Sequence, residues 1–212
     1  MFRNKKEAGE KLAEKLKKYR EKDNTLILSI PCGGVPVANE VAKDLGLPMD
    51  LLVVRKLPMP ENPEAGLGAI SETGEIIWQS QADFYSSEII EKILSEQTKE
   101  IKRRIKVLRQ GRSLPEIKGR VVILVDDGLA MGSTMEAAVL TLKKLEAKKI
   151  IVAVPVGSIE AIKRIKDLAD QVICLETPYP FYAVAQGYYY WHNVTDDEVI
   201  EIIQKFKREN NS

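Results

Sequence analysis

Two adjacent carboxylates, Asp126 and Asp127, stand directly after an apolar run over residues 121–125. Five consecutive apolar residues predict a strand buried on both faces, because a strand with one solvated face would alternate apolar and polar residues. Residues 128–134 form a loop of mostly small residues before a segment with helical spacing, and such a helix N-terminus offers backbone N–H groups to a phosphate. The carboxylates would repel that phosphate, so they must meet hydroxyls or a metal ion instead. A sugar phosphate presents both kinds of group.

Two further predicted strands end in residues that suit an anion. Residues 25–30 are followed by Pro-Cys-Gly-Gly at 31–34, and residues 49–54 are followed by Arg55 and Lys56. Open parallel sheets bind ligands at the carboxyl ends of their strands. Each feature alone is also consistent with a structural role, since glycines are common in tight turns and adjacent cations are often only solvated. Their shared position after a strand favours a binding site.

Helices are predicted between these strands. Apolar residues recur at helical spacing in residues 5–20, 36–45, 86–109, 135–145, 159–168 and 195–207, and further apolar strands are expected at 150–155 and 171–175. Strands and helices therefore alternate, which implies right-handed crossovers between parallel strands. We expect an α/β fold of the doubly wound type, a single domain over residues 1–212 with a mostly parallel sheet and helices on both faces.

Two segments interrupt this alternation. Residues 57–74 are rich in Pro, Gly and Glu, and a small hairpin is expected from residues 67–70 and 75–78. Connections of this length are usually lids over binding sites or disordered spacers, and we interpret residues 57–80 as a lid. Residues 177–193 concentrate aromatic side chains in a loop, which we interpret as a hood over the site.

The composition argues against several classes of function. The chain has 212 residues with 32 Lys and Arg against 31 Asp and Glu, so no global positive field attracts nucleic acid. No secretory segment follows Met1, and no apolar run approaches the ~18 residues of a membrane span. Cys32 and Cys174 are isolated, which gives neither a disulfide framework nor metal-ligand spacing. We therefore expect a cytoplasmic protein with no nucleic-acid or membrane partner.

Three segments together resemble type I phosphoribosyltransferases. VVILVDDGLAMGST at 121–134 resembles the family's signature for phosphoribosyl pyrophosphate, and SIPCGGVPVA at 29–38 resembles its pyrophosphate loop. VVRKLPMPENPE at 53–64 looks like the segment leading into the mobile catalytic loop, and the likeness is greatest to a bacterial and archaeal branch with PRGGVPVA and VRKL motifs. The resemblance implies a Mg²⁺-dependent enzyme, commonly a homodimer. It would transfer the phosphoribosyl group to a small aromatic nitrogenous base and release pyrophosphate, as in nucleotide salvage.

The same resemblance implies roles for single residues. Asp126 and Asp127 would hold the ribose hydroxyls and help to place a Mg²⁺ that is bound chiefly by the ligand. The 5-phosphate would be wrapped by Ala130, Met131, Gly132, Ser133 and Thr134. The pyrophosphate would meet Cys32, Gly33 and Gly34. Arg55 and Lys56 would neutralise the pyrophosphate as it leaves.

Residues of the lid and hood complete the implied site. Phe181 and Tyr182 would stack the incoming base, although a core role for one of them fits the sequence equally well. Glu72 takes the position of a lid carboxylate in adenine-type relatives, while an exposed glutamate in a hairpin turn is otherwise only solubilising. His192 is the single histidine and matches no motif, and a lone histidine is more often structural. The closed lid would exclude water and so prevent hydrolysis of the activated sugar.

Three positions depart from the family pattern. Met131 replaces the usual threonine and Cys32 replaces the usual arginine of the branch, so a hydroxyl and a cation are missing from the implied contacts. Ala130 stands where purine-oxo enzymes carry a third acidic residue, which is nearer the adenine-type pattern. Two alternatives to a transferase stay open: a non-catalytic sensor of the same ligand, and a hydrolase that acts on a ribose phosphate.

Overall fold

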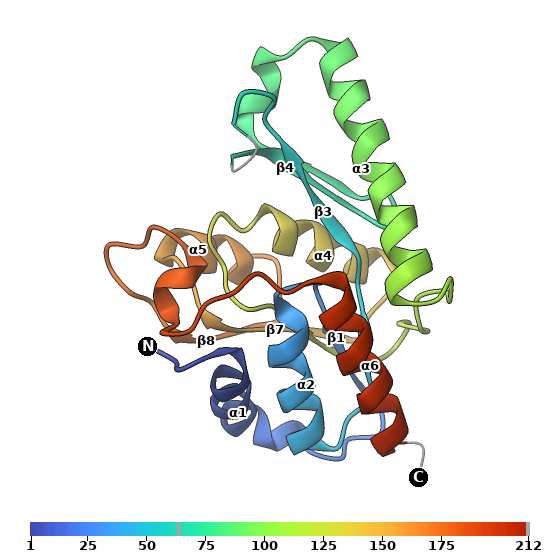
Figure 1. Ribbon diagram of the computed structural model, residues 1–212, viewed down its shortest axis with the longest axis vertical. Helices are drawn as coiled ribbons and strands as arrows, with labels where there is room; N and C mark the ends of the chain where they lie inside the picture. The colour runs from blue at the N-terminus through green and yellow to red at the C-terminus, as the bar shows by residue number, and fades with distance from the viewer. Residues whose placement is uncertain (63–64, 211–212) are drawn as a thin grey trace.

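A five-stranded parallel sheet forms the centre of the body (Figure 1). The computed structural model describes residues 1–62 and 65–210. Pro63 and Glu64 of the expected lid, and Asn211 and Ser212 of the expected domain, lie outside these ranges. The strands run in the order β2-β1-β6-β7-β8, with bounds β1 Thr25–Ser29, β2 Met49–Leu51, β6 Val121–Val125, β7 Lys149–Val156 and β8 Gln171–Glu176. Every neighbouring pair is parallel, so all carboxyl ends lie at one edge.

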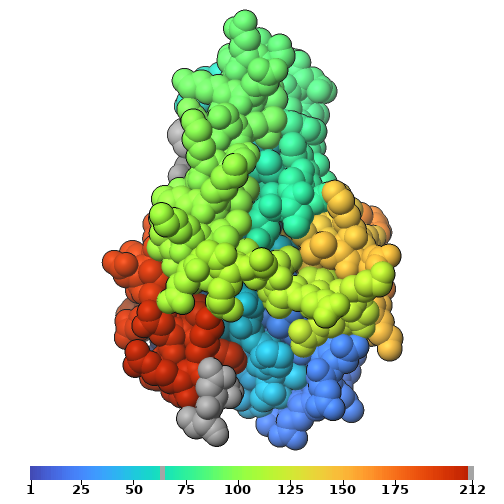
Figure 2. Space-filling model, turned by 90° about the vertical axis from the view of Figure 1, so that its right-hand side faces the viewer, coloured from blue at the N-terminus to red at the C-terminus, as the bar shows by residue number. Residues whose placement is uncertain are grey.

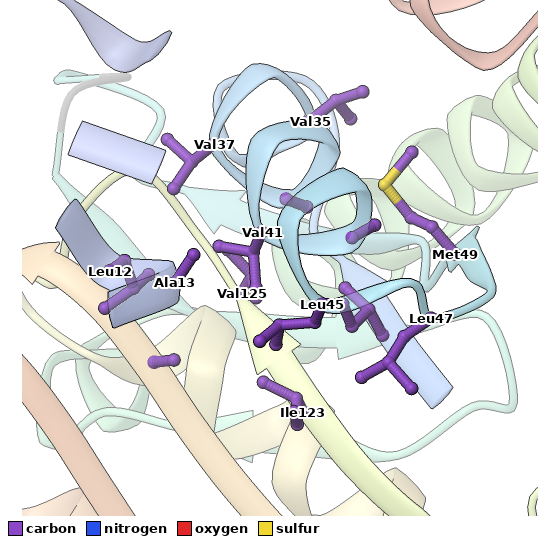
Figure 3. Close-up of a cluster of buried hydrophobic side chains, with 14 of the residues drawn as sticks. Leu12, Ala13, Val35, Val37, Val41, Leu45, Leu47, Met49, Ile123 and Val125 are labelled. Atoms are coloured by element: carbon purple, nitrogen blue, oxygen red, sulfur yellow. The ribbon is translucent and has the colours of Figure 1, made fainter. Parts of the chain in front are cut away.

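Helices cover both faces of this sheet, which confirms the doubly wound α/β fold (Figure 1). One face carries α1 (Lys5–Leu16), α2 (Gly34–Leu45) and α6 (Asp196–Asn210), and the other carries α4 (Ser133–Lys144) and α5 (Ile159–Lys166). Figure 3 shows Ile123 and Val125 of β6 close to Val41 and Leu45 of α2. The alternate strand residues enter a second core with α4 and α5. Both faces of the strands are therefore apolar, as the continuous apolar runs predict.

The expected strand over residues 49–54 is wrong in its extent. β2 ends at Leu51, and the chain crosses at Leu52 and Val53 to begin β3 (Val54–Pro58) in a second sheet. Leu52 and Val53 are fully buried but belong to different hydrophobic clusters. Apolar periodicity reports burial and not hydrogen-bond partners, so a single apolar run spans two strands.

The second sheet and the longest helix form an arm that projects from the body (Figure 1, Figure 2). β3 pairs antiparallel with β4 (Gly66–Ser71), and β4 pairs with β5 (Ile76–Trp78), which confirms the expected hairpin. The helix α3 (Ser87–Leu108) packs against this sheet in a cluster separate from the two body cores. The segment expected as a lid thus shares a core with α3 on one face of the sheet, while Ala69 and Ile77 pack into the body core that contains α4. Within the described ranges, no helix is both long and apolar enough to span a bilayer.

A buried ion pair joins the arm to the body. Glu72, directly after β4, pairs with Arg109, directly after α3, and their side chains are 5% and 1% exposed. The Glu72 carboxylate also accepts a hydrogen bond from the Val53 backbone N–H at 2.8 Å. Arg109 Nη1 donates to the Leu51 carbonyl at 3.1 Å. The pair therefore clamps the short crossing between the two sheets.

Two sequence-based expectations fail at this clamp. The sequence left two interpretations of Glu72, a lid carboxylate of the site and an exposed solubilising glutamate, and neither fits, because the Glu72 side chain is buried against Arg109. Each charge compensates the other, whereas either charge buried alone would be strongly unfavourable. Glu72 therefore stabilises the base of the arm, and its expected catalytic role is withdrawn.

We expect Glu72→Gln to lower the free energy of unfolding by about 3–5 kcal/mol, because it leaves the Arg109 guanidinium buried without a counter-charge. Glu10→Gln is the matched control, since the Glu10 side chain is 56% exposed and lies 3.9 Å from Lys6. Its cost should stay below ~1 kcal/mol, the usual range for an exposed pair. Urea denaturation compares the two variants, and equal stabilities would contradict the clamp.

Candidate functional site

The acidic pair and the glycine loop meet at the carboxyl edge of the sheet, as the sequence predicts. Asp126 and Asp127 follow β6, and residues 31–34 follow its neighbour β1. A Cβ on Gly33 would lie 2.1 Å from Asp127 Oδ2, and a Cβ on Gly34 would lie 2.9 Å from the Asp126 Cα. Glycine is required here because the loop backbone packs directly on the acidic pair.

Negative charge is concentrated in a buried place at this pair. Burial raises the pKa of Asp126, and the adjacent Asp127 carboxylate raises it further. The Asp127 backbone N–H donates to Asp126 Oδ1 at 2.8 Å. Such a site favours positive charge or hydrogen-bond donors from whatever binds there.

Lys5 supplies positive charge to this site. The Asn4 side chain accepts from the Glu7 backbone N–H at 3.0 Å, so α1 begins at Lys5. Lys5 Nζ donates to Asp127 Oδ2 at 2.8 Å, and the Lys5 side chain is only 5% exposed. The sequence reasoning missed this residue. A signal was present, because Lys5 lies three residues before Ala8 on the apolar stripe of α1.

The aromatic hood closes over Lys5. Lys5 Nζ lies 3.4 Å from the Trp191 ring centroid and 5.4 Å from that of Tyr188, and it also donates to the His192 carbonyl at 3.4 Å. The Tyr188 hydroxyl donates to the Asp127 carbonyl at 2.6 Å. Backbone hydrogen bonds join Phe2 to the hood on both sides, at 2.8 and 2.9 Å. The N-terminus and the hood therefore enclose Asp127 together.

A cavity of about 430 Å³ opens beside Asp126. Its lining includes every residue of the expected phosphate loop, namely Ala130, Met131, Gly132, Ser133 and Thr134. Gly132 has φ +90° at the N-cap of α4, a left-handed conformation that favours glycine. Arg164 of α5 donates to the Met131 carbonyl and pairs with Glu136 at 3.2 Å. An arginine that the sequence did not indicate thus braces this loop from outside.

The two predicted base-stacking residues have different environments. Tyr182 lines the cavity and is 81% exposed. Phe181 instead packs against the small core around Phe2 and Tyr188. Of the two alternatives that the sequence left open for this pair, Phe181 takes the core position. His192 lies outside the cavity, with Nε2 3.0 Å from Glu198.

The two predicted cations lie on opposite faces of β3, because successive strand residues alternate. Lys56 lines the cavity together with Gly66. Arg55 points to α3, where its Nε donates to Gln97 Oε1 at 3.1 Å. The structure thus brings both residues to the site, but to different parts of it.

Arg104 of α3 places a second guanidinium beside Arg55. Arg104 Nη1 donates to the Pro31 carbonyl of the glycine loop at 3.3 Å, and its side chain is 14% exposed. Burial lowers the pKa of Arg55, and the like charge of Arg104 lowers it further. Arg104 also pairs with Glu100 at 2.9 Å, so these two guanidinium groups and one carboxylate leave net positive charge beside the glycine loop, which suits an anion. Arg104 lies three residues after Ile101, which belongs to the buried stripe of α3. This helical spacing could have indicated from the sequence that Arg104 faces the body.

Cys32 occupies the place where the family branch has a cation. Its thiol lies 3.4 Å from Asp196 Oδ1, and burial raises its pKa, so it stays protonated and neutral near pH 7. Asp196 in turn pairs with Arg103 at 2.6 Å. Cys32 therefore supports the loop by packing and hydrogen bonding and adds no charge to it.

The acidic pair suits a metal ion that arrives with its ligand. Among the described residues there is no group of three or more His, Cys, Asp and Glu side chains arranged to hold a metal. Mg²⁺ commonly binds to only one or two carboxylates together with substrate phosphates. Asp126 lines the cavity and could supply one such carboxylate.

Comparison with known proteins gives matches to a family, to curated relatives and to solved structures. Residues 3–191 match the family described as "Phosphoribosyl transferase domain". Proteins of Mycobacterium tuberculosis strains CDC 1551 and H37Rv, provisionally named phosphoribosyl transferases, are 38% identical over 99% of this chain, which spans 48% of their length. The crystal structure of TT1426 from Thermus thermophilus is 38% identical with a TM-score of 0.79, covering 97% of this chain and 98% of that chain. The AQ2163 protein of Aquifex aeolicus, 16% identical over 82% of this chain and 73% of that chain with a TM-score of 0.54, shares the fold.

Glu100 links the site to acid stability. Hydrogen bonds from Arg103 and Arg104 lower the pKa of Glu100 to about 2, so its ionised form stabilises the folded protein. This contribution is complete above the ordinary pKa of ~4.5 and is lost as the pH falls towards the lowered value.

We expect Glu100→Gln to cost about 1–2 kcal/mol at pH 7, less than the full shift implies because the carboxylate is partly exposed. The difference from the wild type should shrink between pH 5 and 3, as followed by urea denaturation at each pH. Glu91→Gln, on the exposed face of the same helix, is the control and should show no such dependence. A pH-independent cost for Glu100→Gln would contradict the assigned ion pairs.

Proposed function

The chain belongs to the phosphoribosyl transferase domain family, and we propose that it transfers the phosphoribosyl group of phosphoribosyl pyrophosphate to a nitrogenous aromatic base. The observation that carries the proposal is the order of three subsites along one sheet edge. A phosphate loop lies on one side of the acidic pair, and a glycine loop with two arginines lies on the other. A sugar with a phosphate at one end and a diphosphate at the other matches this order.

Each subsite suits one part of that ligand. The 5-phosphate would bind residues 130–134 at the N-terminus of α4, where backbone N–H groups and two hydroxyls converge. The ribose hydroxyls would donate to Asp126, an acceptor at the cavity wall. The diphosphate would bind residues 32–34, with charge from Arg55 and Arg104.

The departures from the family pattern have compensations in the fold. Cys32 brings no charge, but Arg104 reaches the same loop from α3. Met131 brings no hydroxyl, but Arg164 fixes its carbonyl and so the loop. These arginines support binding of the ligand at both loops, which a transferase and a sensor would share.

The reaction would need mainly electrostatic help from this chain. The bond between C1 and the diphosphate oxygen breaks, the bond between C1 and the base nitrogen forms, and a proton leaves the base. Arg55 and Arg104 would stabilise the departing diphosphate. Mg²⁺, when bound with the ligand, would share that charge. Tyr182 would contact the base, and closure of the arm would exclude water.

Pyrophosphate release tests the function. Phosphoribosyl pyrophosphate and Mg²⁺ are incubated with the protein and with orotate, adenine, guanine, hypoxanthine or a non-purine base. We expect release with one class of base only. Tight binding without release would favour the sensor, and release without any base would favour the hydrolase. Size measurement in solution would test the homodimer, which stays a prediction.

A subsite variant makes the ligand placement testable. We expect Arg104→Gln to weaken binding of phosphoribosyl pyrophosphate by about tenfold to a hundredfold, the worth of a charge-assisted contact. Binding of ribose 5-phosphate should not change, because that sugar lacks the diphosphate. Lys102→Gln is the control, since Lys102 is an exposed cation of the same helix. Calorimetric titration measures all of these, and an equal loss for both sugars would contradict the placement.

A further inference from the structure

Asp127 is enclosed on two sides by the protein itself. Lys5 Nζ lies 2.8 Å from Asp127 Oδ2, and the Gly33 backbone packs against the same oxygen. The two carboxylates therefore differ in their surroundings, since Asp126 lines the cavity and Asp127 does not. Asp127 is the point at which α1, the hood and the glycine loop meet.

The surroundings of Lys5 strengthen its pairing with Asp127. Its side chain is 5% exposed and that of Asp127 is 13% exposed, so water screens the pair poorly. The faces of Trp191 and Tyr188 hold the ammonium in place. The pair is 122 residues apart in sequence, so it also ties the chain's beginning to the sheet edge.

The positive charge of Lys5 has a role in addition to the packing of its side chain. Two ionised carboxylates at the sheet edge would repel a diphosphate bound at the adjoining loop. The Lys5 ammonium offsets the charge of Asp127, so the loop next to it can accept an anion while Asp126 stays available to the sugar. An apolar side chain of similar length would fill the space but leave that repulsion.

We propose that Lys5 is a positioning residue of the transferase site, acting through Asp127. Its ammonium fixes the Asp127 carboxylate against Gly33 and so sets the glycine loop relative to Asp126. The inference rests on the proposed function. It adds to the site a residue from the N-terminal helix, outside all three motif segments.

Three variants test the role of the charge. Lys5→Met should raise the KM for phosphoribosyl pyrophosphate by about tenfold or more, since small misplacements of a site are costly, and leave the KM for the base unchanged. Lys5→Arg should restore most of the loss, because arginine keeps the charge and stacks on aromatic rings. Lys6→Met is the control, as the Lys6 side chain is 67% exposed. A lower thermal midpoint for Lys5→Met with an unchanged KM would overturn the proposal, since it would mean that Lys5 only packs the hood.

A double-mutant cycle with Asp127→Asn tests whether Lys5 acts through that carboxylate. Once Asp127 is neutral, adding Lys5→Met should change the dissociation constant of phosphoribosyl pyrophosphate by less than about threefold. Fully additive losses would overturn the proposal. Absence of binding by the wild type is a separate result, which would refute the proposed function itself. Binding by the wild type with equal affinity in Lys5→Met would refute the role of Lys5 alone.

Discussion

Asp126 and Asp127 lie at the buried end of β6, and the residues packed around them accommodate the negative charge of this pair. Burial and the neighbouring carboxylate both raise the pKa of Asp126. The groups packed on the pair either supply positive charge, as Lys5 does, or occupy almost no space, as Gly33 and Gly34 do. A parallel sheet makes this concentration possible, because every strand delivers its carboxyl end to one edge. The hood and the N-terminus are then held in place by their contacts with the same pair.

A second buried ion pair fixes the base of the arm. Glu72 and Arg109 compensate each other at the crossing between the two sheets. The arm has its own hydrophobic cluster with α3, and it joins the body at this clamp and where Val54 and Ala69 pack in the core beside α4. The clamp gives the arm a fixed base beside the cavity, while Lys56 of the arm reaches the cavity wall.

Arginines from α3 and α5 contact the two loops whose own motifs lack an expected cation or hydroxyl group. The glycine loop carries Cys32 and the phosphate loop carries Met131, and each loop accepts a hydrogen bond from an arginine of another element. Motif residues alone thus underestimate the charge of the site. A loop that has lost a cation from its own sequence can still bind an anion when a packed helix supplies one. The glycine loop and the acidic pair lie side by side because the strands that they follow, β1 and β6, are neighbours.

The strands, the helices and the edge at which the site forms could be predicted from the order of residues. Continuous apolar runs report burial on both faces, helical stripes report a single buried face, and carboxylates or glycines after parallel strands must share an edge. Which charges pair depends instead on the folded chain. Lys5, Arg104 and Arg109 lie on or beside apolar helix stripes, a position that is consistent with burial but does not tell what they contact. Their partners lie up to 187 residues away, and the strand ending at Leu51 stops where a distant carboxylate and guanidinium fix the crossing. The spacing of apolar residues is a local property of the sequence, and it indicates which positions are buried. A buried charge must be compensated by another group, and only the fold decides which group lies next to it.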